Sequence, residues 1–144
     1  MCIRDRYYIA ALNNFIVAGT GNKVEDFGVG FYTKYGDGGV DLSPIADLTK
    51  TQVFDLASHL DIIDIIQKAS PTDGLWGDQR TDENQLGATY PELEWAMNAH
   101  EKNLPHSEFS PHQKQVLQIF KRHFIKNQHK MQPIPVCKIP LVLI

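Results

Sequence analysis

The side chains best suited to bind phosphate or a metal ion follow a short apolar run near the N-terminus. Gly19, Thr20 and Gly21 come directly after this run and offer a hydroxyl group and backbone N–H groups. Glu25 follows with a hard carboxylate oxygen of the kind that Mg²⁺ prefers. A tight turn capped by the threonine has the same composition, so this segment alone favours a structural turn.

A second candidate segment is glycine-rich and runs from Gly28 to Asp41. Its glycines let the backbone approach a ligand closely, because they carry no side chain. Lys34 offers positive charge to a phosphate, and Asp37 and Asp41 offer acceptors to ribose hydroxyls or to an amine. A flexible surface loop is an equally good interpretation of this segment by itself.

Cations farther along the chain are weaker candidates for phosphate binding. Lys50 lies in the first turn of a predicted helix, where a cation is unfavourable with the helix dipole. Together with Thr72 it would suit a phosphate, and the basic run that ends in His129 and Lys130 would neutralise a pyrophosphate. Taken singly, these residues are better explained as a solvated cation, a turn residue and a solvated helix face.

Composition restricts the class of protein. The 144 residues predict one domain, and a net charge of −3 argues against a nucleic-acid partner. No apolar run approaches the ~20 residues that a membrane span needs. Cys2 and Cys137 are too few for a disulfide framework and are not spaced as a metal site, so we expect a reduced, cytoplasmic setting.

The elements that must position these residues are predicted from apolar spacing and turn signals. Residues 7–12 are typical of a helix end, and residues 15–18 suit a buried parallel strand, beyond whose carboxyl end ligands of open α/β sheets bind. Capping boxes predict helices that begin after Thr49 and Ser110, and a further helix is expected near Pro91. In the helix that begins after Thr49, the residues expected to face a core are Val53, Leu56, Ala57 and Leu60.

Taken together, these segments resemble the NAD synthetase family, with order and spacing that match over residues 7–138. The resemblance is carried by Gly19-Thr20-Gly21-Asn22-Lys23-Val24-Glu25, by Phe31-Tyr32-Thr33-Lys34-Tyr35-Gly36-Asp37-Gly38-Gly39-Val40-Asp41, by Pro44, Leu48-Thr49-Lys50 and Pro71-Thr72, and by Asp82-Glu83, Leu86-Gly87, Tyr90 and His129-Lys130-Met131.

The resemblance implies an α/β fold with a Rossmann-like, doubly wound parallel sheet of the ATP-pyrophosphatase (adenine nucleotide alpha-hydrolase-like) type. That fold binds ATP through an N-terminal Ser-Gly-Gly-x-Asp-Ser loop, which this sequence lacks, so we expect the sheet to be incomplete here. Residues 7–144 are interpreted as the C-terminal part of a single synthetase domain. Residues 1–6 are interpreted as a non-native remnant.

The implied activity is the Mg²⁺-dependent amidation of deamido-NAD by ammonia, the last step of NAD biosynthesis. ATP adenylates the nicotinate carboxylate and releases pyrophosphate, and ammonia then displaces AMP from the NAD-adenylate intermediate. The full-length family member is expected to be a cytoplasmic homodimer with no nucleic-acid or membrane partner, and the 144-residue chain alone is expected to be inactive. The alternatives are a non-enzymatic nucleotide-binding or dimerisation module, and the synthetase part of a glutamine-dependent enzyme.

The family's functional residues match particular positions of this sequence. The resemblance implies that Thr20, Lys50 and Thr72 bind ATP, that Glu25 binds Mg²⁺, that Lys34, Asp41, His129 and Lys130 bind deamido-NAD, and that Asp37 is catalytic near the nicotinate end. The family also carries an arginine pair that reaches deamido-NAD. Arg4 and Arg6 lie near that place but out of register, and the role is not transferred to them.

Overall fold

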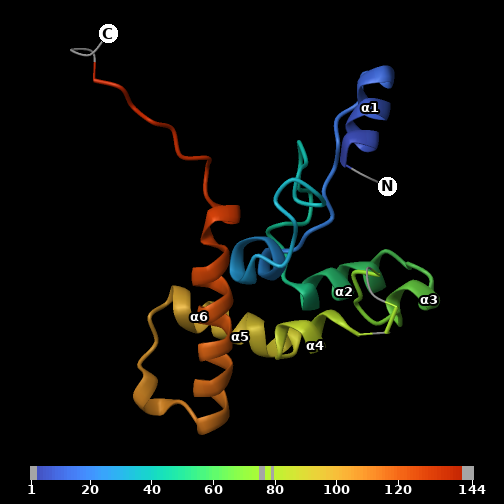
Figure 1. Cartoon of the computed structure of the whole chain (residues 1–144). Coiled ribbons are helices and arrows are strands. Elements are labelled where there is room, and N and C mark those ends of the chain that lie inside the picture. The colour runs from blue at the N-terminus through green and yellow to red at the C-terminus, as the bar shows by residue number, and fades with distance from the viewer. Residues whose placement is uncertain (1–2, 75–76, 79, 141–144) are drawn as a thin grey trace.

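Helices dominate the computed structural model, which describes residues 3–74, 77–78 and 80–140 (Figure 1). Within those residues, no helix combines the length and the apolar character that a membrane crossing requires. In chain order the elements are α1 (Ile3–Asn13), the π-helical turn η1 (Val24–Val29), α2 (Lys50–His59), α3 (Asp64–Gln67), α4 (Asp82–Leu86), α5 (Tyr90–Glu101), the 3₁₀ turn η2 (His106–Glu108) and α6 (Pro111–Met131).

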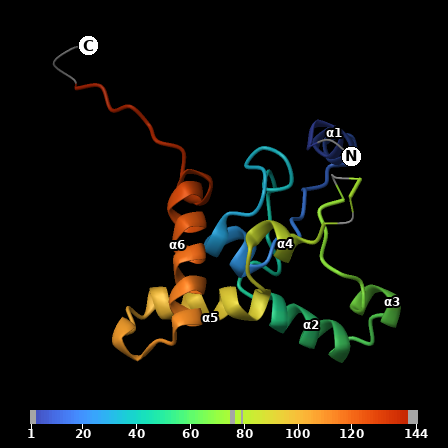
Figure 2. The ribbon, with the colours of Figure 1, turned by 60° about the horizontal axis from the view of Figure 1, so that its bottom comes forward.

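The apolar core lies where η1, α5 and α6 meet, and α6 crosses α5 in both views (Figures 1 and 2). Leu93 on α5 and Phe120 on α6 are fully buried, and Val24 and Val29 of η1 close the cluster from the third side. Full burial of such a side chain contributes about 1.5–3 kcal/mol. These three elements are therefore the part of the chain that apolar packing fixes most strongly.

The predicted helix starts are confirmed. The hydroxyls of Thr49 and Ser110 accept hydrogen bonds from the N–H groups of Gln52 and Gln113, and both glutamine side chains return the contact to the backbone. Each box satisfies backbone groups that a helix start leaves unpaired. The helix end predicted within residues 7–12 is confirmed as the last part of α1.

The apolar stripe of α2 does not face a core of this chain, so that prediction is wrong. α2 has no buried residue, and Leu56 and Leu60 are 39% and 61% exposed. The isoleucines of the following segment are equally open, with Ile65 77% exposed. Val53 and Ala57 of the same stripe are half-buried, so the described elements cover that face only in part.

The strand predicted at residues 15–18 is reduced to one parallel bridge, between Ala18 and Leu42. Val17 is buried, but Phe15 and Ile16 are 70% and 67% exposed. A parallel strand is normally covered on both faces and paired along its length. Among the described residues no regular strand forms beside it, and the doubly wound sheet is not observed there.

The position of α1 depends on contacts with the glycine-rich segment. Arg6 Nη2 donates to the carbonyl oxygen of Gly36 at 3.2 Å, and Tyr7 Oη donates to Asp41 Oδ1 at 3.0 Å. Ile3 to Arg6 continue the helix in register, while Met1 and Cys2 lie outside the described residues. The interpretation of residues 1–6 as non-native stays a prediction.

The junction between η1 and α6 requires a glycine. Gly30 ends η1 with φ +62°, and a Cβ atom added there would lie 2.4 Å from Asn127 Cβ. Asn127 Nδ2 donates to the carbonyl oxygen of Val29 at 2.7 Å, and Lys130 Nζ donates to that of Gly30 at 2.8 Å. Because α6 holds two successive carbonyl groups, the backbone of η1 lies too close to the helix for any side chain at this position.

We expect Gly30→Ala to lower the free energy of unfolding by about 3 kcal/mol, because the methyl group meets both a positive φ and Asn127. Gly87 is the matched control, since its φ is +81° but its Cβ would meet nothing within 4 Å. Gly87→Ala should therefore cost only about 1 kcal/mol of backbone strain. Urea unfolding measures both, and equal losses would contradict a steric constraint from α6.

Candidate active site

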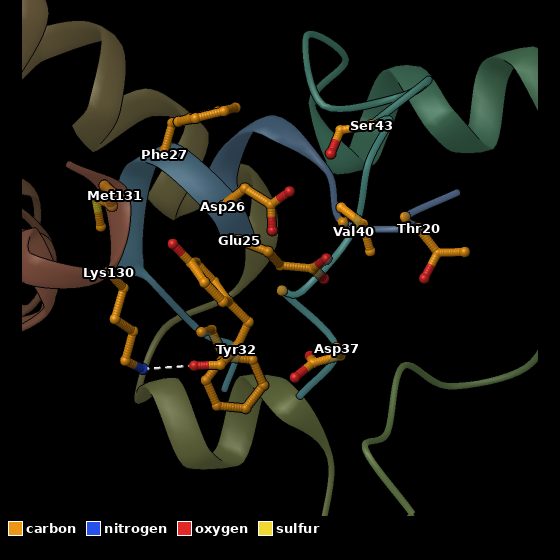
Figure 3. A pocket seen from close by; sticks show the side chains of 14 residues that line it. Thr20, Glu25, Asp26, Phe27, Tyr32, Asp37, Val40, Ser43, Lys130 and Met131 are labelled. Carbon is orange, nitrogen blue, oxygen red and sulfur yellow. Dashed lines mark hydrogen bonds between the residues drawn. The ribbon is translucent and has the colours of Figure 1, made fainter. Parts of the chain in front are cut away.

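A pocket of about 290 Å³ lies where the loop after Ala18, η1, the glycine-rich segment and the end of α6 meet (Figure 3). Thr20, Glu25, Asp37 and Lys130 line it, so the structure brings these predicted site residues together. In Figure 3 the carboxylates of Glu25 and Asp37 lie on one side of the Tyr32 ring and Lys130 lies on the other. The pocket therefore presents an acidic wall and a basic wall to one space.

Asn22 fixes the local backbone of the acidic wall. Its side chain is 2% exposed, and its Oδ1 accepts from the N–H groups of Val24 at 3.0 Å and Glu25 at 3.1 Å. These bonds begin η1 and fix the direction in which Glu25 leaves the backbone. No role was predicted for Asn22, although asparagine before a helical turn is a capping signal that could have identified it.

Glu25 joins the pocket to two helices. Its Oε1 accepts from Lys50 Nζ of α2 at 3.1 Å and from the hydroxyl of Tyr90, the first residue of α5. Its Oε2 accepts only a 3.4 Å bond from the N–H group of Asn22 among its described contacts. The structure thus pairs two predicted ligand residues, and it gives Lys50 a reason to lie in the first turn of α2.

Asp26 is a pocket residue that sequence reasoning missed. Burial raises its pKa to about 6, and the negative charges of Glu25 and Asp37 add to the rise. An Oδ1 of Asp26 lies so near Gly21 that a Cβ there would be 2.1 Å away. The signal in the sequence was only a second acid beside Glu25, and the π-helical turn that directs it into the pocket was not predicted.

These carboxylates suit a divalent cation that is bound together with phosphates. Burial is the main cause of the raised pKa of Asp26, and a cation would relieve the repulsion from Glu25 and Asp37 that adds to it. Among the described residues, no group of three or more His, Cys, Asp or Glu side chains could hold a metal ion by itself. Mg²⁺ usually takes one or two carboxylates with water and substrate phosphates, so the absence of a full protein cage is compatible with Glu25 as its ligand.

Three of the predicted deamido-NAD ligands gather at the end of α6. Lys130 Nζ donates to the carbonyl oxygens of Gly30 and Tyr32, the latter at 2.6 Å, and burial lowers its pKa (Figure 3). Lys34 Nζ donates to the carbonyl oxygen of His129, whose own side chain is exposed. Lys34, His129 and Lys130 are therefore neighbours, although the first comes from the glycine-rich segment.

Asp41 and Thr72 lie outside the pocket. The carboxylate of Asp41 accepts from the N–H group of Val17 at 2.8 Å and from Tyr7 Oη, so it ties the segment after α1 to the bridge. Thr72 is exposed, and its Oγ1 accepts from the N–H group of Gly74 at 3.1 Å in a local turn. Their roles as ligands stay predictions.

Next to Glu25 lies a buried polar pair, Tyr90 and Asp82, for which no role was predicted. Tyr90 is 3% exposed and Asp82 is 7% exposed, and Tyr90 Oη lies 3.4 Å from Asp82 Oδ2. Burial raises the pKa of both side chains. Asp82 is the first residue of α4, and its Oδ1 is buried without a hydrogen-bond partner among the described residues. A buried carboxylate oxygen without a hydrogen-bond partner is uncommon in a folded protein.

Comparison with known proteins identifies the family. A sequence model of the NAD synthase family matches residues 1–134, and the chain therefore belongs to that family. The NH3-dependent NAD⁺ synthetase of Archaeoglobus fulgidus is 41% identical over 133 residues, which cover 92% of this chain and 51% of that protein. The corresponding enzyme of Syntrophomonas wolfei is 40% identical over 134 residues, which cover 93% and 49%. The chain spans about half the length of these curated relatives.

Solved structures support the family fold. The NMN synthetase from Francisella tularensis matches with a TM-score of 0.79 and 30% identity, over 95% of this chain and 52% of that chain. The NH3-dependent NAD synthetase from Campylobacter jejuni, in complex with the nitrate ion, matches with a TM-score of 0.68 and 24% identity, over 94% and 52%. The second likeness concerns the fold alone.

Replacing Asp26 by asparagine tests the electrostatics of the pocket. Because the folded-state pKa of about 6 lies above the ordinary 3.8, the folded protein holds this proton more tightly than the unfolded chain does. That stability is fully present below about pH 4 and is lost as the pH rises through about 6. We therefore expect Asp26→Asn to raise the melting temperature at pH 7.5 and to leave it nearly unchanged at pH 4.5.

Circular dichroism melts across this pH range measure the effect, and Asp55→Asn on the exposed face of α2 is the control. A pH-independent difference for Asp26→Asn would mean that the carboxylate is not crowded by its neighbours.

Proposed function

We propose that this protein is the part of an ATP-dependent ligase that amidates the nicotinate carboxylate of deamido-NAD with ammonia, to give NAD⁺, AMP and pyrophosphate. The observation that carries the proposal is the pocket lined by Thr20, Glu25, Asp37 and Lys130, with Lys50 paired to Glu25, in a chain of this family. ATP, deamido-NAD and ammonia are the proposed substrates, and Mg²⁺ is the proposed metal ion. The reaction would be the last step of NAD biosynthesis, in the cytoplasm.

The first half of the reaction makes the carboxylate reactive. A carboxylate is a poor electrophile, and its attack on the α-phosphorus of ATP expels pyrophosphate and leaves AMP as an activating group. Thr20 and Lys50 would bind ATP, with Lys50 meeting the negative charge that develops on the departing pyrophosphate. Magnesium at Glu25 supplies further neutralisation of phosphate charge when bound. Thr72 would contact ATP from the loop before α4.

The second half needs deamido-NAD to be held while ammonia attacks the adenylated carbonyl. Lys34, His129 and Lys130, adjacent in the structure, would bind the dinucleotide, and Asp41 would accept from one of its hydroxyls. Asp37 lines the pocket and would orient the amine and take up a proton as the new C–N bond forms. AMP leaves as this bond forms.

The proposal also covers the fold and the assembly. We infer that residues 15–18 form a full strand of the doubly wound parallel sheet in the complete protein. We also infer that the complete protein is a homodimer. Support comes from the exposed Phe15 and Ile16 beside a bridge that already has parallel direction. The Ser-Gly-Gly-x-Asp-Ser loop would come from the half of the family length that this chain does not span, so the 144-residue chain alone would be inactive.

A second candidate is the same chemistry on the mononucleotide. The Francisella tularensis structure is an NMN synthetase, and its likeness to this chain favours a test with nicotinate mononucleotide. The other rivals are a nucleotide-binding module without activity and a glutamine-dependent enzyme with an attached amidase. The ligase proposed above and these three rivals are all compatible with the same pocket. They differ in which compounds, if any, are converted to product.

The test measures NAD⁺ formation from deamido-NAD, ATP, Mg²⁺ and ammonium by the 144-residue chain and by a chain extended upstream through the phosphate loop. We expect activity only in the extended chain. Glu25→Gln there should lower kcat/KM about 100-fold, because it removes a charged group from the site. Glu101→Gln, at the exposed end of α5, should leave the rate unchanged.

Parallel reactions separate the rivals. Product from nicotinate mononucleotide but not from deamido-NAD would replace the dinucleotide with the mononucleotide as substrate, and product only with glutamine would indicate an amidase partner. No product from the extended chain, with deamido-NAD still bound, would overturn the ligase in favour of a binding module.

A further inference from the structure

We propose that Tyr90 is a positioning residue for the metal site. Its hydroxyl orients the Glu25 carboxylate by occupying Oε1, so that only Oε2 is left for a divalent cation. The inference rests on the proposed role of Glu25 as the magnesium ligand. It adds a residue from α5 that does not line the pocket and that touches neither substrate nor metal ion.

The two oxygens of Glu25 have unequal surroundings. Oε1 accepts from Lys50 Nζ at 3.1 Å and from the Tyr90 hydroxyl, whereas Oε2 accepts only the long 3.4 Å bond from Asn22 among its described contacts. An ionised carboxylate oxygen with two donors, one of them charged, has little capacity left for a cation. The carboxylate is therefore fixed in rotation, with one oxygen committed to the protein.

Tyr90 is held firmly by burial and by its backbone. It is 3% exposed, and its backbone N–H group donates to Glu83 Oε1 at 2.9 Å where α5 begins. Its ring lies under Lys50 Nζ, 4.8 Å from the ring centroid. The tyrosine therefore places Lys50 as well as Glu25, so one rigid side chain sets the geometry of both charged groups.

Asp82 restricts the direction of the Tyr90 hydroxyl further. Its Oδ2 lies 3.4 Å from Tyr90 Oη, behind the contact with Glu25, and Asp82 is 7% exposed. The hydroxyl has one proton and the nearer acceptor is Glu25, so the proton is directed to Glu25. Residues that orient a metal ligand in this way usually affect metal affinity about 10- to 100-fold when they are lost.

The test titrates Mn²⁺ into the upstream-extended chain in the presence of ATP and follows free Mn²⁺ by its EPR signal. Tyr90→Phe keeps the ring and removes only the hydroxyl, and we expect it to weaken Mn²⁺ binding about 10- to 100-fold. Tyr8→Phe, which removes a hydroxyl from a residue 65% exposed on α1, should leave the affinity within about twofold. The Mg²⁺ concentration for half-maximal rate should rise with the Mn²⁺ dissociation constant, while kcat at saturating Mg²⁺ changes less than about threefold.

A second variant keeps the test decisive if Tyr90→Phe folds poorly. Glu25→Asp keeps the charge but is one methylene shorter, so it cannot reach Tyr90 and a cation together. It should weaken Mn²⁺ binding by a similar factor, and its effect should not add to that of Tyr90→Phe, because both changes break the same contact. Additive losses would contradict the inference.

The outcomes separate the inference from the function on which it rests. Mn²⁺ affinity within about twofold of the unaltered protein for Tyr90→Phe, with Glu25→Gln strongly impaired, would overturn the role of Tyr90 and leave the metal site in place. Unchanged affinity in both variants would remove Glu25 from the metal site, and the proposed role would fall with it. Loss in both, with the melting temperature of Tyr90→Phe kept, is the expected result.

Discussion

The carboxylate of Glu25 is the constraint on which the rest of the site depends. It is mostly buried, and a buried charge costs several kcal/mol unless it is paired and hydrogen-bonded. The partners come from different parts of the chain, Lys50 from α2 and Tyr90 from α5, while Glu25 itself belongs to η1. One unfavourable charge therefore requires three elements to meet at one point, and that point lies on the wall of the pocket.

The three elements are held there in different ways. η1 and α5 share the apolar core with α6, whereas α2 has no buried residue. α2 is held to its neighbours through polar contacts, the Lys50–Glu25 pair and the bonds from the backbone and hydroxyl of Thr51 to Glu94 of α5. Apolar packing of η1 thus fixes the position of Glu25, and the ion pair with Glu25 fixes Lys50 beside it.

Local chemistry was readable from the sequence, and contacts between distant residues were not. Thr49 and Ser110 predicted helix starts because a capping box is complete within four residues. The resemblance supplied Thr20, Glu25 and Lys130 as ligands and Asp37 as a catalytic residue, and the structure gathers the four in one pocket. Neither source gave Asp26 its place there, because η1 is stabilised by packing of Gly28 against Met97 and Phe120, which no local pattern encodes.

The exposed stripe of α2 and the strand at residues 15–18, which is reduced to one bridge, share a physical cause. Apolar spacing in α2 and the apolar run at residues 15–18 each identify a surface that is costly to leave in water, but neither pattern specifies what covers it. Leu60 and Phe15 remain open in a chain that spans about half the length of its relatives. Neither Leu60 nor Phe15 lines the pocket, which is formed by the loop after Ala18, η1, the glycine-rich segment and the end of α6. The pocket is therefore formed among the described residues, although the sheet that the family fold implies is not observed there.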